Sequence, residues 1–267
     1  MFLSYYGLDK NLFQKEINSK EAYQSANYKN IMNRLSYLRD VRGIGLFTGG
    51  SGMGKTYVLR CFTDALNKDL YHVIYISVSR LTVFEFLNAL CIELGLDVGN
   101  CYRNDVERKI QQEIKKRKKE QNKNTILILD NAENLNSGVI LELKTLYDFE
   151  MDSVDYVSII LMGNEKIKSE LKKAKYESFQ QRIIVQYTLE NLTRSEVKEY
   201  VETRLKLSGQ TNQIFNEKSL NALFQVSGGN IRKLNHLIIT CMIVGYQKQS
   251  KIIDEEIVRL AKEEMDL

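Results

Sequence analysis

The sequence predicts an α/β fold in which a parallel sheet, covered by helices on both faces, is followed by a smaller domain of helices. Short apolar runs alternate with segments of helical periodicity from residue 44 onward, and the strand-like runs stop after Leu189. Strands that alternate with helices form parallel sheets, which gives a three-layer αβα arrangement. We therefore expect a mostly helical lead-in over 1–43, an α/β domain over 44–190 and a helical domain over 191–267.

The predicted strands are short apolar runs of the kind that parallel sheets bury. They lie at 44–48 (IGLFT), 72–77 (HVIYIS), 125–130 (TILILD), 156–163 (YVSIILMG) and 182–189 (RIIVQYTL). Helical patterns separate and follow them, at 54–66, 81–94, 104–122, 139–149, 193–207, 217–227, 230–246 and 254–265. Thr193 and Glu196 have the spacing of a capping box, and Gly228-Gly229 breaks one helix from the next.

Composition limits the classes of protein to consider. The chain has 267 residues, 43% of them hydrophobic, which suits one large domain or a domain with a small satellite. A net charge of +4 is too mild for a dedicated nucleic-acid module, so DNA binding would need a local patch. No signal peptide or membrane span is evident. The cysteines lack metal-ligand spacing, and we expect reduced thiols of a cytoplasmic protein at Cys61, Cys91, Cys101 and Cys241.

Residues 49–56, GGSGMGKT, match the spacing G-x-x-x-x-G-K-[ST] of a phosphate-binding loop. They follow a predicted strand and open a predicted helix, as this motif requires; an ordinary glycine-rich turn is the alternative. Glycines let backbone N–H groups surround phosphate oxygens, and the helix N-terminus adds partial positive charge. We expect this phosphate loop and the residue after it to bind ATP through Gly49, Gly50, Ser51, Gly52, Met53, Gly54, Lys55, Thr56 and Tyr57.

The segment TILILDNAENL, residues 125–135, places Asp130 at the end of a predicted strand. A carboxylate there would hold Mg²⁺ together with the hydroxyl of Thr56. The next residue, Asn131, can hold a water by hydrogen bonds but cannot accept its proton. Glu133 is the nearest alternative carboxylate, although it equally fits a solvated glutamate at a helix start. We expect tight Mg·ATP binding and slow hydrolysis.

Five motifs occur in the order found in AAA+ ATPases, a P-loop NTPase family that the chain resembles over nearly its whole length. They are GGSGMGKT, LILDNAENL, LMGN, SFQQRI and SGGNIRKLN. Together with ENLTRSEVKEYVETRLKLSG, the last two resemble most the transposition-helper ATPases of bacterial insertion sequences and Tn-type elements, which share these patterns with ExeA-like secretion ATPases. The resemblance implies ATPase activity with ATP and Mg²⁺, and a helical lid domain. Asn131 departs from the family, which usually has glutamate there.

The resemblance also implies roles for three residues. Asn164 matches the polar sensor that touches the γ-phosphate or the water, and a turn-capping asparagine is the alternative. Arg182 matches an arginine that reaches the nucleotide of a neighbouring subunit, and a surface ion pair is the alternative. Arg232 matches the second sensor, on the lid. With Asn131 and Glu133, these residues form the expected catalytic set.

DNA binding is expected from the resemblance and only partly from the residues. One candidate is the segment SVSRLT at 77–82, where Arg80 stands among hydroxyl side chains, and another is LKKAKY at 171–176. The basic run at 115–119 is a further candidate, although such runs are often only solvated helix surface; it consists of Lys115, Lys116, Arg117, Lys118 and Lys119. Contacts of this kind would be independent of sequence.

Three functions are the main alternatives, and a replication loader or cell-division ATPase, which shares the same core, is a further one. The first is an ATP-dependent regulator of transposition that assembles as a ring or filament on double-stranded DNA and recruits or activates a separate transposase. The second is an ExeA-like secretion or cell-envelope ATPase, for which a membrane span and a peptidoglycan-binding extension would be expected. The third is a nucleotide switch that hardly hydrolyses ATP, which Asn131 favours.

Overall fold

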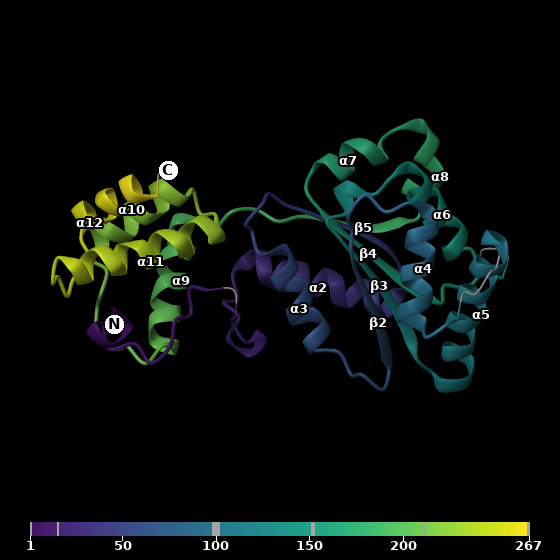
Figure 1. Cartoon of the computed structure of the whole chain (residues 1–267), viewed down its shortest axis with the longest axis horizontal. Helices are drawn as coiled ribbons and strands as arrows, with labels where there is room; N and C mark the ends of the chain where they lie inside the picture. The colour runs from purple at the N-terminus through teal and green to yellow at the C-terminus, as the bar shows by residue number, and fades with distance from the viewer. Residues whose placement is uncertain (1, 15, 98–101, 151–152, 211, 266–267) are drawn as a thin grey trace. The chain divides into compact units, whose positions relative to one another are not determined.

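The computed structural model describes residues 2–14, 16–97, 102–150, 153–210 and 212–265, which form two compact units (Figure 1). The sheet unit consists of Asn30–Gly50 and Lys55–Leu189. The helical unit consists of Met1–Lys29, Ser51–Gly54 and Glu190–Leu267. The phosphate loop thus contributes residues to both units.

The sheet unit contains a five-stranded parallel sheet of order β2-β3-β4-β1-β5. The strands are β1 (Gly43–Thr48), β2 (Tyr71–Ser77), β3 (Asn124–Asp130), β4 (Val157–Gly163) and β5 (Ile183–Thr188). The register pairs Ser77 with Asp130, Asp130 with Met162 and Thr48 with Gly163. The carboxyl ends of the four strands β2, β3, β4 and β1 therefore meet at one edge of the sheet, where the candidate site residues lie. The parallel α/β prediction is confirmed.

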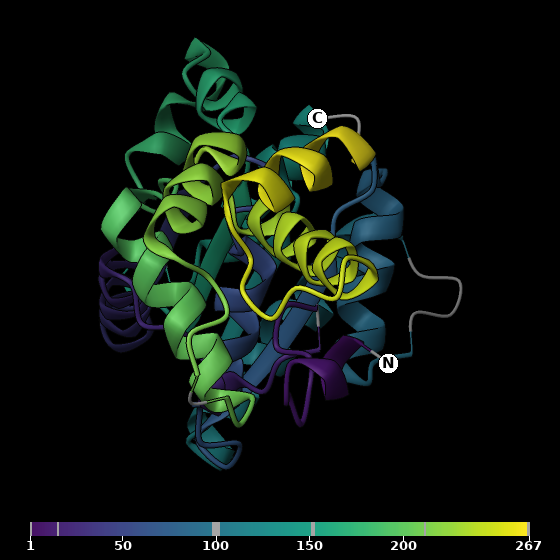
Figure 2. The ribbon, with the colours of Figure 1, turned by 90° about the vertical axis from the view of Figure 1, so that its left-hand side faces the viewer.

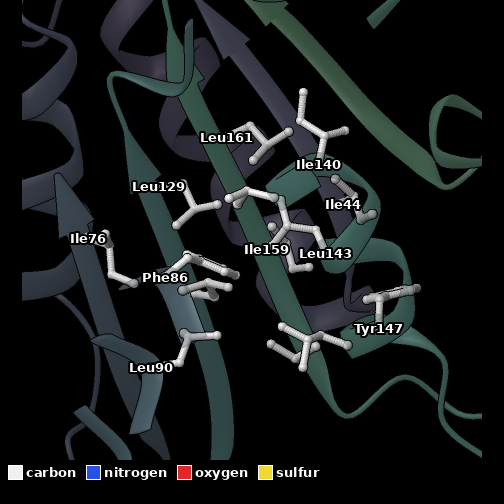
Figure 3. Close-up of a cluster of buried hydrophobic side chains, with 14 of the residues drawn as sticks. Ile44, Ile76, Phe86, Leu90, Leu129, Ile140, Leu143, Tyr147, Ile159 and Leu161 are labelled. Carbon is white, nitrogen blue, oxygen red and sulfur yellow. The ribbon is translucent and has the colours of Figure 1, made fainter. Parts of the chain in front are cut away.

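Helices cover both faces of this sheet. Alternate residues of a strand point to opposite faces, and in β3 both sets are buried: Leu127 and Leu129 on one face, Ile126 and Ile128 on the other. Figure 3 shows Leu129 packed with Phe86 and Leu143, which come from α4 (Val83–Leu94) and α6 (Ser137–Tyr147).

The remaining helices of the sheet unit complete the layers. On the opposite face, Leu38 of α2 (Ala26–Val41) packs against Gly45 of β1. A Cβ on Gly45 would lie only 2.5 Å from Leu38 Cδ2, so this close packing requires glycine. The other helices are α3 (Lys55–Asp64), α5 (Arg103–Gln121), α7 (Lys166–Leu171) and α8 (Glu177–Gln180). The short helices α7 and α8 were not predicted, because six and four residues are too few to show a helical period.

The helical unit is built on α9 (Arg194–Leu207), α10 (Glu217–Ser227), α11 (Ile231–Gln247) and α12 (Glu255–Glu264), with the short α1 (Phe2–Tyr5) and the 3₁₀ turn η1 (Ser19–Glu21). Figure 2 shows α11 and α12 side by side, and residues such as Leu237, Met242 and Val258 fill the core beneath them. The predicted capping box of Thr193 and Glu196 is present at the start of α9.

Two expectations from composition can be followed into the structure. Cys61, Cys91 and Cys241 are buried, and Cys101 lies outside the described residues. Among the helices that the structure describes, none is both long enough and apolar enough to cross a membrane.

Candidate nucleotide site

The phosphate loop leaves β1 at Thr48 and enters α3 at Lys55. Gly52 and Gly54 have φ values of +81° and +84°, a left-handed conformation that glycine adopts without steric cost. The Lys55 ammonium donates to the carbonyl oxygens of Gly49 and Gly50, at 2.9 and 2.8 Å. The Lys55 side chain therefore folds back over the phosphate loop, and its positive charge lies beside the backbone of Gly49 and Gly50.

Within the helical unit, the tip of the phosphate loop contacts the start of α11. The Asn230 side chain donates to the Ser51 carbonyl oxygen at 2.7 Å, and the Arg232 backbone N–H donates to the Gly52 carbonyl oxygen at 3.1 Å. The Arg232 guanidinium donates to the Ser51 hydroxyl at 3.3 Å. A Cβ on Gly52 would lie 2.5 Å from Asn230 Oδ1. Sequence reasoning did not select Asn230 as a site residue; its position as the cap after Gly228-Gly229 was the available signal.

The carboxylate of Asp130 is almost fully buried, with 1% of the residue exposed. Its Oδ2 accepts hydrogen bonds from the Thr56 hydroxyl at 2.6 Å and the Tyr75 hydroxyl at 3.0 Å, and its Oδ1 accepts the Asn131 backbone N–H at 2.9 Å. Burial, and then the charge of Asp130, raise the pKa of Tyr75 to about 12, so its hydroxyl is a donor at neutral pH. No motif pointed to Tyr75, because its position on β2 meets Asp130 only through strand pairing.

Asn131 turns the chain away from β3 with a left-handed backbone, at φ +57°. Asparagine adopts this conformation more readily than most residues, because its short amide bonds locally. Its side-chain nitrogen donates to the Ser77 hydroxyl at 3.2 Å. The amide is thus directed toward the end of β2, beside Asp130.

Three asparagines after β3 hold the loop that follows β2, which we call the Arg80 loop (residues 77–82). Besides Asn131 to Ser77, Asn134 donates to the Val78 carbonyl oxygen at 3.4 Å and Asn136 to the Leu81 carbonyl oxygen at 2.6 Å. Arg80 itself is exposed, and its φ of +37° is unusual for arginine. The Arg80 loop is therefore fixed to the segment that carries Asp130.

Glu133 and Asn164 lie together after the adjacent strands β3 and β4. The Asn164 backbone N–H donates to Glu133 Oε2 at 3.0 Å, and its side-chain nitrogen donates to Glu133 Oε1 at 2.9 Å. Sequence reasoning selected both residues but did not foresee their contact.

Arg182 lies elsewhere in the sheet unit. It directly precedes β5, and Ile183 pairs with Ile44 near the start of β1, so Arg182 is at the amino ends of the strands. Its guanidinium lies 5.6 Å from the centroid of the Tyr147 ring. Within one chain, the parallel sheet separates this arginine from the edge that carries Asp130 and Gly163.

The basic run at 115–119 lies on α5 and is largely paired with neighbouring groups. Lys115 and Lys119 both contact the Glu150 carboxylate, at 2.8 and 3.1 Å, and together with Tyr156 they lower the pKa of Glu150 to about 2. Arg117 bonds Glu113 and the Leu94 carbonyl oxygen, and Lys118 bonds Asn122. Lys116 is exposed. These contacts leave less positive charge for a polyanion than the sequence alone suggested.

A family model described as AAA domain matches residues 38–171, half of the chain. The chain belongs to the AAA domain family. Its AAA domain includes the phosphate loop, Asp130, Glu133 and Asn164, which supports nucleotide binding and ATPase activity in general.

A curated relative of this AAA protein is General secretion pathway protein A of Aeromonas hydrophila. The two are 29% identical over 269 residues, which include 98% of this chain and 48% of the relative. The chain therefore spans about half the length of the curated relative that it matches.

Solved structures similar to this AAA protein share its fold at low sequence identity. Cdc6p of Pyrobaculum aerophilum matches with a TM-score of 0.72 at 15% identity, over 94% of this chain and 70% of that one. The ORC1 protein of Aeropyrum pernix, solved in complex with DNA, matches with a TM-score of 0.65 at 16% identity, over 98% and 69%. The RuvB Holliday junction branch migration motor of Thermotoga maritima matches with a TM-score of 0.57 at 17% identity, over 90% and 69%.

Proposed function

We propose that this AAA protein binds Mg·ATP, hydrolyses it slowly, and uses the bound nucleotide to assemble on double-stranded DNA and regulate transposition. The observation that carries the nucleotide part is the hydrogen bond between Thr56 and Asp130. It joins the phosphate loop's helix to the end of β3, so that a hydroxyl and a carboxylate oxygen meet beside the loop that carries Lys55.

The residues present fit a triphosphate. The loop's backbone N–H groups and the N-terminus of α3, a helix of 10 residues, favour anionic oxygens. Lys55 now bonds two carbonyl oxygens of the loop, and in the proposed complex it exchanges these for phosphate oxygens. Gly49 to Thr56 form the cradle, and Tyr57 follows on the first turn of α3.

The residues also fit Mg²⁺, because Thr56 and Asp130 present hard oxygen donors, which this ion prefers. When bound, the ion would neutralise charge on the phosphates. Thr56 and Asp130 would hold it, and the hydrogen bonds from Tyr75 and Asn131 would keep the Asp130 carboxylate oriented.

Slow hydrolysis follows from the side chain at position 131. An amide can orient a water but cannot take its proton, and general-base catalysis typically contributes 10² to 10⁴ in rate. Asn131 is directed to Ser77, where its amide nitrogen is a donor and its oxygen can accept from a water. We assign it to orientation of the water only.

Two arginines remain to be assigned. Within the helical unit, Arg232 and Asn230 contact Ser51 of the phosphate loop, and the family resemblance implies that Arg232 acts as the second sensor. Arg182 lies at the amino ends of the strands, away from Asp130 in its own chain, so a role at the nucleotide requires a neighbouring copy. Self-association into a ring or filament is therefore part of the proposal.

For DNA, the Arg80 loop is the favoured contact. Arg80 is exposed, and the loop is attached to the segment after Asp130 by three asparagine side chains. The run at 115–119 is a weaker candidate because four of its five side chains already bond groups of the protein. A protein of the same fold, the ORC1 protein of Aeropyrum pernix, was solved in complex with DNA, which shows that this fold is compatible with DNA binding.

The second candidate process is secretion. It is favoured by the 29% identity with General secretion pathway protein A over nearly the whole chain. In this alternative the same ATPase module would act in the cell envelope, and DNA would have no effect on it. A nucleotide switch with very little turnover is compatible with either process.

Electron microscopy of the protein with ATP and duplex DNA tests the first proposal. We expect rings or filaments on DNA that require ATP and are absent for Lys55→Ala. Calorimetry with Mg·ATP on the same samples tests the nucleotide site separately. ATP binding without any assembly on DNA, and a turnover unaffected by DNA, would favour the secretion alternative instead. Retention of a separate transposase on the assembled DNA complex, and its loss without ATP, would extend the proposal to transposition.

A further inference from the structure

The Glu133 carboxylate is bonded at both oxygens by a single residue. Oε2 accepts the backbone N–H of Asn164 at 3.0 Å, and Oε1 accepts its side-chain nitrogen at 2.9 Å. Glu133 lies in the 3₁₀ turn η2 (Ala132–Asn134) directly after β3, and Asn164 directly follows β4. This two-point contact holds both the backbone and the side chain of Asn164.

The contact also determines which way the Asn164 amide faces. Its oxygen Oδ1 accepts the Lys166 backbone N–H at 2.9 Å, and its nitrogen faces a carboxylate, which can only accept when ionised. A flipped amide would set oxygen against carboxylate and nitrogen against an N–H donor. Since a side-chain amide nitrogen carries two hydrogens, one bond to Glu133 leaves the second hydrogen for another acceptor.

Packing places this pair beside the phosphate loop. A Cβ on Gly163 would lie 2.6 Å from Glu133 Oε2 and 3.1 Å from the Glu133 backbone nitrogen, so the carboxylate occupies the space that any other residue at 163 would need. The Gly163 carbonyl oxygen accepts the Gly49 backbone N–H at 3.1 Å. Glu133 therefore packs against Gly163, and Gly163 is hydrogen-bonded to Gly49, the first residue of the phosphate loop.

We propose that Glu133 is a positioning residue for Asn164: it fixes the amide so that an N–H, and not the carbonyl oxygen, faces the transferring phosphoryl group. This rests on the proposed nucleotide site. In this proposal Glu133 acts through Asn164 and not on the water, since each of its carboxylate oxygens already accepts a hydrogen bond from that residue. Glu133 therefore does not serve as the general base that is missing at Asn131. Hydrolysis stays slow even though Glu133 is only two residues away.

The first test is a double-mutant cycle of Glu133→Gln and Asn164→Ala, measured in single-turnover ATP hydrolysis. A positioning role acts only through Asn164, so we expect the two single variants to lose activity and the double variant to be no slower than Asn164→Ala alone. A further loss of tenfold or more when Glu133→Gln is added to Asn164→Ala would show that Glu133 acts on the reaction directly and would overturn the proposal. Glu165→Gln, an exposed carboxylate next to Asn164 in the chain, is the matched control and should hydrolyse ATP like the unchanged protein.

The second test does not depend on turnover. Hydrogen exchange of the Asn164 backbone N–H should be slow in the unchanged protein and in Glu165→Gln, and at least tenfold faster in Glu133→Gln, where that N–H meets a weaker acceptor. Unchanged exchange would overturn the positioning role. If neither the unchanged protein nor any variant binds Mg·ATP in calorimetry, the proposed nucleotide site is wrong. The exchange result still decides whether Glu133 holds Asn164.

The third test reverses the pair. In Glu133→Gln with Asn164→Asp, the glutamine can donate to the new carboxylate and accept the backbone N–H, so slow exchange at residue 164 should return. Residue 164 then has no side-chain N–H, and hydrolysis should stay as slow as in Asn164→Ala. Hydrolysis at the rate of the unchanged protein would contradict the proposal.

Discussion

The Thr56 hydroxyl donates a 2.6 Å hydrogen bond to the Asp130 carboxylate, which joins the first turn of α3 to the end of β3 across 74 residues of sequence. Thr56 ends the phosphate loop, and Asp130 ends β3. The Asp130 carboxylate is buried and accepts three hydrogen bonds. The contact places two oxygen donors within reach of one cation. It is the relationship on which the proposed magnesium site depends.

Replacement of Thr56 by valine should weaken Mg·ATP binding at least tenfold, because the hydroxyl is lost as a metal ligand. Binding of ATP in excess EDTA should change by less than twofold, since the loop and Lys55 are intact. Thr56→Ser, which keeps the hydroxyl, should stay within threefold of the unchanged protein in both conditions. Calorimetry with and without Mg²⁺ makes the comparison. An equal loss in both conditions would mean that Thr56 supports the loop but not a metal.

Replacement of Asn131 by glutamate should raise the rate of ATP hydrolysis, because it introduces a group that can accept the proton of the attacking water. General-base catalysis predicts an increase of about 10²-fold or more. The left-handed backbone at this position should make the variant less stable by about 1 kcal/mol, since glutamate lacks the local bonding of asparagine. Single-turnover kinetics and thermal unfolding measure the two effects.

Asn131→Gln is the control for that change, because it lengthens the side chain without adding a base. It should be less stable by a similar amount and should not hydrolyse ATP faster. A rate for Asn131→Glu equal to that of the unchanged protein would show that the proposed reason for slow hydrolysis is wrong.

Replacement of Arg80 by alanine should weaken duplex DNA binding and make its salt dependence less steep. Each phosphate contact that is lost lowers the slope of log affinity against log salt by about 0.9. Lys68→Ala removes the same charge from an exposed position outside the candidate DNA contacts and should leave the slope unchanged. Fluorescence anisotropy over a salt series measures both. Equal slopes for Arg80→Ala and the unchanged protein would exclude the Arg80 loop as a DNA contact.

The stability of the sheet unit should fall as pH rises toward neutrality because of Glu142. Burial, and then the neighbouring Glu107, raise the pKa of this carboxyl group to about 7, while Arg103 opposes the shift. The folded chain therefore holds a proton that the unfolded chain releases at a pH of about 4.5. Its contribution to the free energy of unfolding is complete below about 4.5 and is lost as pH rises through about 7.

Glu142→Gln should flatten this pH dependence, since glutamine stays neutral throughout. We expect the variant to be more stable than the unchanged protein at pH 8 by a larger margin than at pH 5. Thermal unfolding at the two pH values measures the margin. The same margin at both would show that Glu142 does not titrate between them.

Much of the fold could be predicted from the sequence because its signals are local. The run TILILD shows a buried strand by its own composition, and β3 ends at Asp130 as expected. Thr193 and Glu196 are close enough in sequence to show a capping box, which the structure contains. By contrast, α7 and α8 were missed because they are too short to show a period.

The candidate site was only partly foreseeable. The spacing of GGSGMGKT indicated Lys55 and Thr56, because a phosphate loop is continuous in sequence. Tyr75 was missed because it meets Asp130 only through a tertiary contact, and Asn230 was missed although its place after Gly228-Gly229 marked it as a helix cap. The orientation of Glu133 was left open between a solvated helix start and the water, and its bonds to Asn164 are a third arrangement.

The sequence by itself determined the order of strands and helices, the phosphate loop and the amide at position 131, since these depend on neighbouring residues and on side-chain chemistry. Only the tertiary structure decided which groups meet: Tyr75 with Asp130, the asparagines with the Arg80 loop, and Glu133 with Asn164. The physical reason is strand pairing. The spatial order β2-β3-β4-β1-β5 in the sheet brings the ends of strands that are distant in sequence to one edge. No single strand's sequence specifies which strands will be its neighbours.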